Sequence, residues 1–131
     1  MNDALVQFLY ARYDEDERTA RAATQGDWVW SREFVTPPGY HHRTVGPLEP
    51  GDAAFIAAHN PARVLREIDA KRQLLEEHQD VNDGSCGTCV DGRWGYPTHG
   101  GSSPQRYPCR TLRLLALPYA DRPGYREEWR P

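Results

Sequence analysis

Three cysteines and one histidine are the residues of this chain whose types and spacing point to chemistry. In chain order they are His78, Cys86, Cys89 and Cys109. Cys86 and Cys89 form a Cys-x2-Cys pair with a glycine inside it, and such a turn presents two thiolates to one tetrahedral zinc ion. Cys109 stands where a helix is predicted to begin, and the positive end of a helix favours a thiolate over a thiol. His78 ends a long predicted helix, from which a neutral imidazole can supply the fourth ligand.

These four residues predict a closed zinc site that is structural rather than catalytic. Three thiolates and one imidazole fill the tetrahedron, so no position is left for a reacting water. The surrounding segment, residues 79–108, is rich in glycine and proline and has few apolar residues. Because structural zinc binding is itself folding free energy, the ion would hold together a segment that side chains alone cannot. We therefore expect the metal to join two helix ends and a loop.

Other interpretations of these residues stay open on the sequence alone. His99 competes with His78 for the fourth position, although ordering the glycine-rich stretch around His99 costs conformational entropy. The adjacent His41 and His42 would face opposite sides of a strand, which disfavours both as ligands of one ion. The metal can be zinc or another thiophilic ion, and three unliganded thiols are a further alternative. A thioredoxin-like redox pair is disfavoured because glycines and aspartates surround the cysteine pair.

The N-terminal part of the chain predicts a helix followed by a small β-hairpin. Residues 3–23 follow the helical period, with Asn2 or Asp3 as the cap. Residues 27–35 alternate in the manner of a strand, and a short second strand is expected around residues 42–45.

Two further helices are predicted before the cysteine segment. A short one covers residues 53–58, with Asp52 as its cap. A long one runs from Pro61 to His78, with Asn60 as its cap and proline at its first position. The predicted inner face of the long helix comprises Val64, Leu65, Ile68, Arg72 and Leu75.

The C-terminal part predicts a loop, a short helix and an aromatic tail. Residues 79–108 show no periodicity, so we expect an irregular loop there. The stretch CRTLRLLAL predicts a helix with Leu112 and Leu115 inward, ended by Pro118. Three aromatic residues are expected to lie back over the helices: Tyr119, Tyr125 and Trp129.

The whole pattern predicts a helix-dominated α+β fold with three to four helices, a small N-terminal β-hairpin and a zinc-knuckle loop that joins helix ends. We expect a single domain over residues 1–131. Its parts are a helix plus β-hairpin (1–50), a helical hairpin with the long helix (51–78), the metal-binding loop (79–110), and a C-terminal helix and tail (110–131).

The composition narrows the class of protein. The chain has 131 residues, 38% of them hydrophobic, and a formal net charge of −3. A net negative charge argues against a general nucleic-acid binder. No apolar run approaches the roughly 20 residues of a membrane span, and the acidic N-terminus is unlike a signal peptide. The sequence therefore predicts a cytoplasmic protein without a membrane segment.

The leading functional hypothesis is a zinc-stabilised protein-interaction or regulatory module with a protein partner. The sequence lacks a glycine-rich phosphate loop, a nucleophile elbow and a His-Glu-x-x-His pair, so we expect no enzyme activity. An enzyme stays an alternative if only the three thiolates bind the metal, because water can then take the fourth position. Glu76 or Glu77 would be the base of such a site.

A nucleic-acid-binding regulator is the second alternative. The stretch from Arg106 to Pro131 carries more arginines than acids and has tyrosine and tryptophan interleaved, a combination that can hold phosphates and stack bases. The arginines are Arg106, Arg110, Arg113, Arg122, Arg126 and Arg130. The simpler interpretation is that these arginines are solvated and pair with the acidic first helix.

The chain also resembles a family of small uncharacterised proteins of high-GC bacteria and their phages, known as a domain of unknown function. The resemblance covers nearly the whole chain and is most specific over residues 61–78 and 107–131. It implies a histidine after the long helix, a cysteine pair, and a Pro-Cys before the last helix, which correspond here to His78, Cys86, Cys89 and Pro108-Cys109. The resemblance implies no activity, but it favours His78 as the fourth ligand.

Overall fold

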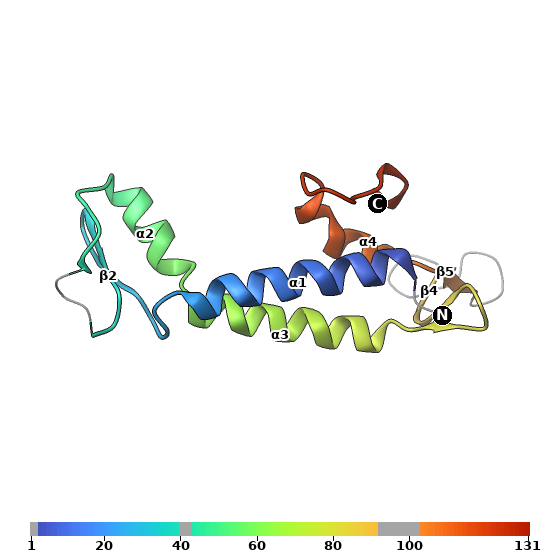
Figure 1. Cartoon of the computed structure of the whole chain (residues 1–131). Helices are drawn as coiled ribbons and strands as arrows, with labels where there is room; N and C mark the ends of the chain where they lie inside the picture. Colours follow the sequence, from blue (N-terminus) through green and yellow to red (C-terminus); the bar gives the residue numbers. More distant parts are fainter. Residues whose placement is uncertain (1–2, 40–42, 92–102) are drawn as a thin grey trace. The chain divides into compact units, whose positions relative to one another are not determined.

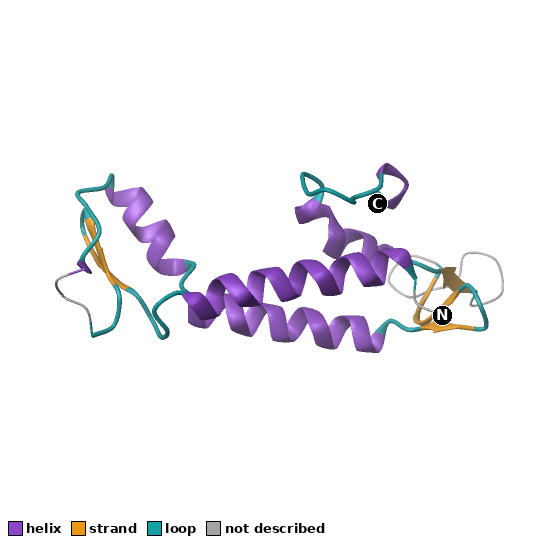
Figure 2. Ribbon diagram, viewed as in Figure 1, coloured by secondary structure: helices purple, strands orange, loops and turns teal. Residues whose placement is uncertain are grey.

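The computed structural model describes residues 3–39, 43–91 and 103–131 (Figure 1). Within them, the helices are α1 (Ala4–Ala22), α2 (Pro50–Ala58), α3 (Pro61–Glu77) and α4 (Arg110–Ala116), with 3₁₀ turns at Leu117–Tyr119 and Glu127–Trp129. The strands are β1 (Val29–Ser31), β2 (Phe34–Thr36), β3 (Asp80–Val81), β4 (Ser85–Val90) and β5 (Pro104–Arg106). Four helices with two small antiparallel sheets confirm the helix-dominated α+β class (Figure 2). None of the described helices is long and apolar enough to cross a membrane.

The two long helices begin at side chains that the sequence marks as caps. Asp3 Oδ1 accepts a hydrogen bond of 2.8 Å from the N–H of Leu5 at the start of α1. Asn60 Oδ1 accepts one of 3.0 Å from the N–H of Arg63, and Pro61 takes the first position of α3. The predicted caps and the existence of both helices are confirmed.

The short helix α2 begins earlier than predicted. It starts at Pro50 rather than Ala53, and Asp52 lies inside its first turn instead of capping it. Glu49 occupies the cap position without a side-chain hydrogen bond. Proline fits the first helical position because its missing N–H would have no partner there, and this start was overlooked.

The prediction of one strand over residues 27–35 is wrong, because the chain reverses inside it. β1 and β2 form a hairpin in which Ser31 pairs with Phe34, and Arg32 turns the chain at a φ of 52°. The apolar alternation runs through the turn, and no glycine or asparagine marks it. Val45 then bridges to Val35 through hydrogen bonds of 3.0 and 2.8 Å, at one end of the expected second strand.

The irregular loop predicted over residues 79–108 is also wrong in part. It contains the three-stranded antiparallel sheet β3–β4–β5, in which β4 carries both Cys86 and Cys89. The β3–β4 turn places Asn82 and Asp83 at a φ of 53° each, a conformation that these residue types tolerate. The strands were missed because they are short and lack alternating β-branched residues.

The chain divides into two compact units, to which α1 and α3 both contribute. Unit 1 comprises residues 1–13 and 71–131, and unit 2 comprises residues 14–70. The core of unit 2 consists of small and medium-sized side chains. One cluster has Val35, Ala53 and Ala57 buried, with Trp28 and Leu48 packed against them, and Ala20 and Ile68 are buried as well.

Unit 1 has a larger core in which the C-terminal tail takes part. The ring of Phe8 lies 6.5 Å from that of Tyr119, 6.1 Å from that of Tyr125 and 5.2 Å from that of Trp129, between ring centroids. Tyr119 and Trp129 are buried. The prediction that these aromatic residues lie back over the helices is confirmed. The other large buried side chains of this unit are Leu5, Leu9, Tyr13, Leu75 and Leu112.

Candidate metal centre

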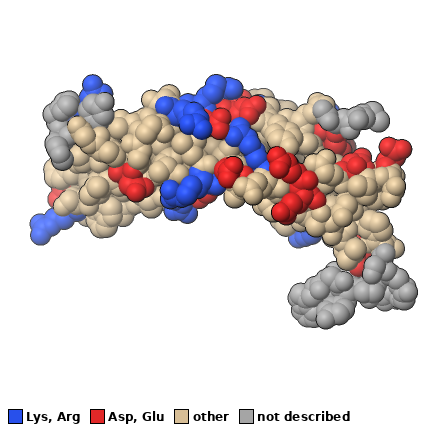
Figure 3. All heavy atoms as spheres, turned by 90° about the horizontal axis from the view of Figure 1, so that it is seen from below, with Lys and Arg blue, Asp and Glu red and all other residues tan. Residues whose placement is uncertain are grey.

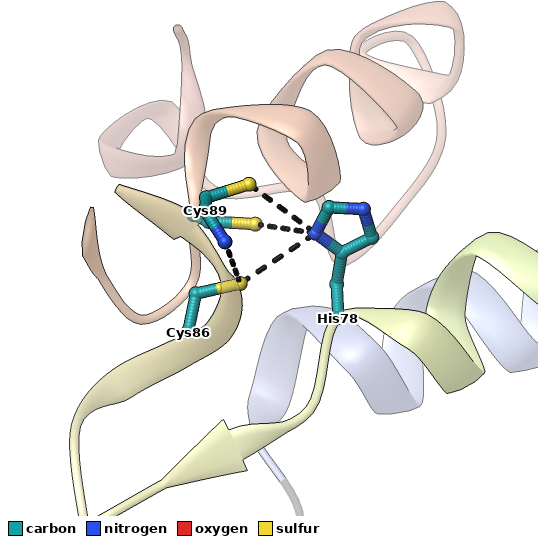
Figure 4. A group of neighbouring side chains, drawn as sticks. His78, Cys86 and Cys89 are labelled. Carbon is teal, nitrogen blue, oxygen red and sulfur yellow. Dashed lines mark hydrogen bonds between the residues drawn. The ribbon is translucent and has the colours of Figure 1, made fainter. Parts of the chain in front are cut away.

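Four side chains from three parts of unit 1 converge on one point. The ligand atoms of His78, Cys86, Cys89 and Cys109 all lie within 4.8 Å of one another. His78 directly follows α3, the cysteine pair comes from β4, and Cys109 is the residue that caps α4. Figure 4 shows the imidazole of His78 facing the sulfur atoms. The structure thus brings together the four residues that the sequence selects, in a group able to bind a metal ion.

The distances within the cluster match those of a tetrahedral metal site. Nδ1 of His78 lies 3.5 Å from Cys86 Sγ, 3.3 Å from Cys89 Sγ and 3.5 Å from Cys109 Sγ. Tetrahedral zinc, with Zn–S of about 2.3 Å and Zn–N of about 2.0 Å, would separate nitrogen from sulfur by about 3.5 Å. Because Nδ1 is nearly equidistant from the three sulfurs, it is the histidine atom that would contact a metal ion bound at this point.

The cluster is largely screened from solvent. Cys109 is fully buried, while Cys86 is 2% and His78 is 6% exposed. Cys89 is half-buried, so one edge of the group lies nearer the surface. Buried polar groups are usually paired or coordinate a metal, and here the four donors face one another.

Backbone N–H groups stabilise a thiolate at Cys86. The N–H groups of Thr88 and Cys89 each donate to Cys86 Sγ over 3.4 Å. Burial raises the pKa of Cys86. The two N–H groups and the Cys109 and Cys89 thiols together lower this pKa by more, so it lies below its ordinary value. The hydroxyl of Thr111 in α4 lies 3.6 Å from Cys89 Sγ, where it can donate to a thiolate.

Cys109 departs from the expectation that a helix start favours its thiolate. Burial raises the pKa of Cys109 to about 12, although the N–H of Leu112 in the first turn of α4 acts in the opposite direction. Desolvation therefore outweighs the helix end, and the neighbouring Cys86 adds to the upward shift. A bound cation would supply the missing positive charge, since a coordinating thiol is deprotonated.

Three hydrogen bonds fix the backbone that carries the histidine. Tyr107 donates its hydroxyl to the His78 carbonyl over 2.6 Å, and the N–H of Gly87 donates to the Gln79 carbonyl over 2.9 Å. The hydroxyl of Thr88 donates to the carbonyl of Glu77. Burial and the nearby Asp3 carboxylate raise the pKa of Tyr107, which keeps its hydroxyl a donor. The sequence analysis does not predict the supporting roles of Thr88 and Tyr107. The available signal was a hydroxyl side chain close to a cysteine in the sequence.

The other histidines and acids singled out in the sequence have different positions. His41, His42 and His99 lie outside the described residues. The side chains of Glu76 and Glu77 are exposed and lie outside the four-residue cluster.

His59, which stands between α2 and α3, makes local contacts. Its Nδ1 lies 2.9 Å from the Phe55 carbonyl, and its ring stacks on that of Phe55. Both contacts fix the end of α2.

Comparison with protein-family models assigns the chain to a family. A protein-family model described as "Family of unknown function (DUF6221)" matches residues 2–131. The chain belongs to this family. The resemblance to a family of unknown function is thereby confirmed, and the description names no activity. No curated protein and no solved structure matches the chain significantly.

Proposed function

We propose that His78, Cys86, Cys89 and Cys109 bind a single zinc ion and that this ion has a structural role. The observation that carries the proposal is the spacing of 3.3–3.5 Å between His78 Nδ1 and the three sulfurs. Three sulfurs and one imidazole nitrogen are a donor set typical of structural zinc. Four protein donors complete the tetrahedron, which favours a non-catalytic site.

The position of the donors supports a structural role. They come from the end of α3, from β4 and from the start of α4, so one ion would link segments that are far apart in the sequence. The short sheet β3–β4–β5 has few apolar side chains of its own with which to hold this arrangement. Metal binding would supply that cohesion as folding free energy.

We propose further that the protein acts as an interaction or regulatory module rather than as an enzyme. Support comes from unit 2, in which large apolar side chains are exposed although its core is small. These side chains are Val29, Trp30, Phe34, Val45, Phe55 and Ile56. We expect these side chains, which are presented by the hairpin segment and by α2, to contact another macromolecule.

Elemental analysis of the purified protein tests the metal proposal. We expect about one zinc ion per chain in the parent protein, as a closed four-ligand site requires. The variants Cys86→Ser and His78→Ala should lose the metal, because each removes one of the four donors. His59→Ala is the matched control, since this histidine is exposed and bonds only locally, and it should keep the zinc. A parent protein without a thiophilic metal would overturn the proposal.

A further inference from the structure

Unit 1 contains an open groove whose walls carry four arginines. The groove has a volume of about 640 Å³ and is lined by Arg106 of β5, Arg110 and Arg113 of α4, and Arg126 of the tail. Ligand-binding clefts commonly have volumes of about 300–1,000 Å³. Because the four guanidinium groups come from three segments, the fold rather than the sequence brings them together.

Two of these arginines are occupied by groups of the protein itself. Arg126 Nη1 lies 3.6 Å from a carboxylate oxygen of Glu128, and Arg113 Nη1 donates to the Arg130 carbonyl over 3.2 Å. Arg106 and Arg110 are exposed, and within the described part of the chain no carboxylate forms an ion pair with either side chain. The groove therefore offers two available guanidinium groups, which suit carboxylates or phosphates.

The groove also carries acidic groups, and these restrict the kind of anion that fits. Asp3, Asp91 and Glu128 line it together with the arginines. Asp3 Oδ1 accepts a hydrogen bond from the N–H of Leu5, and the Glu128 carboxylate forms an ion pair with Arg126. A polyphosphate backbone would bring a negative charge close to each of these carboxylates. A peptide can space its acidic side chains to meet the arginines and avoid the protein's own acids.

The aromatic residues of the groove do not favour nucleic acid. Trp129 is 5% exposed and packs against Phe8, so its ring faces are not available to stack on bases. The hydroxyl of Tyr107 is held by the carbonyl of His78. On the face drawn in Figure 3, the described Lys and Arg side chains lie next to Asp and Glu rather than in a region of one sign. In the groove itself, Asp3, Asp91 and Glu128 lie among the lining residues together with the arginines, so a strand of phosphates finds no wall of one sign.

We propose that this groove binds an acidic peptide segment of a partner protein, with carboxylates of the peptide paired to Arg106 and Arg110. The inference rests on the proposed zinc site, since Cys109 lies between these two arginines in the sequence and fixes the start of α4. It adds to the proposed interaction function a surface and a class of ligand.

Fluorescence anisotropy with a short labelled peptide of alternating glutamate and serine tests this inference on the zinc-loaded full chain. We expect salt-dependent binding, because exposed ion pairs are screened. Arg106→Gln and Arg110→Gln should each weaken binding on the order of three- to tenfold. Arg66→Gln is the matched control, since Arg66 is an exposed arginine of α3 in unit 2 and should leave the affinity unchanged.

The competing outcomes separate the alternatives. A peptide in which glutamine replaces glutamate should not bind; equal binding of both peptides, or no binding by zinc-loaded protein, would overturn the inference. Tighter binding of a single-stranded oligonucleotide than of the acidic peptide would overturn it in favour of nucleic acid. Zinc is measured in the same samples. Zinc without peptide binding rejects the groove alone, whereas peptide binding by a parent protein without zinc rejects the metal proposal alone.

Discussion

The two compact units differ in what stabilises each of them internally. Unit 1 buries large side chains, among them Leu9, Tyr13 and Trp129, and it also contains the four-residue cluster. Unit 2 buries smaller side chains, namely Ala20, Val35, Ala53, Ala57 and Ile68. Among the described residues, the cluster thus lies in the unit with the larger core, not in the one with the smaller core. If the proposed zinc ion is bound, the thiols compensate for a local deficit, because the sheet β3–β4–β5 has few apolar side chains of its own.

Metal removal is expected to change stability more than any single substitution, and to affect unit 1 much more than unit 2. Stripping zinc with a chelator should cost unit 1 a large part of its stability, because the binding free energy of structural zinc reaches about 10 kcal/mol or more in small domains. Hydrogen exchange should show loss of amide protection in β4 and α4. Amides of β1, β2 and α2 should change much less. Restored protection on return of zinc is the control, and unchanged protection in β4 after verified metal loss would contradict the account.

Removing a tryptophan tests the comparison at the level of apolar packing. Trp129→Ala should destabilise the protein by about 3–5 kcal/mol, because a buried aromatic ring leaves a cavity against Phe8. Trp30→Ala is the matched change in unit 2, where the ring is 48% exposed, and it should have a much smaller effect. Urea denaturation measures both. Equal losses of unfolding free energy in the two variants would contradict the comparison, because they would mean that Trp30 stabilises unit 2 as much as Trp129 stabilises unit 1.

A pair of valines in the hairpin gives the smallest expected effect. Val35 is fully buried against Ala53 and Ala57, whereas Val29 is 65% exposed on the paired strand. Val35→Ala should cost about 1–2 kcal/mol and Val29→Ala less than about 0.5 kcal/mol. Thermal unfolding of both variants measures the difference. A larger loss for Val29→Ala would mean that unit 2 is covered by another surface in solution.

The donor set and the long helices could be predicted because their signals are local. Asp3 and Asn60 cap by hydrogen bonds to groups two and three residues away, and the Cys-x2-Cys turn contains its own geometry. The structure places His78 in the cluster, at a helix end whose carbonyl accepts a hydrogen bond from Tyr107, and the choice of His78 over His99 stays a prediction. Each of these features depends on a few residues that are close in the sequence, or on a residue type such as cysteine that has few structural roles.

The hairpin turn and the cysteine-bearing sheet could not be predicted by periodicity. Arg32 adopts its positive φ without a turn signal in the sequence, so tertiary context decides that turn. The sheet forms from strands of two to six residues that are paired by backbone hydrogen bonds and show no apolar alternation. The stretch Asn82-Asp83-Gly84 did carry a turn signal that the absence of periodicity obscured. Likewise, the pKa of Cys109 depends on burial, which the sequence does not reveal.

Zinc K-edge X-ray absorption of the purified protein tests the proposed donor set, because it counts the sulfur and nitrogen atoms around the ion. We expect three sulfurs at about 2.3 Å and one nitrogen at about 2.0 Å in the parent protein. His99→Ala should leave this spectrum unchanged, and any metal that His78→Ala still binds should lack the imidazole nitrogen. A first shell of oxygen and nitrogen, a shell unchanged in His78→Ala, or a protein without zinc would contradict the claim.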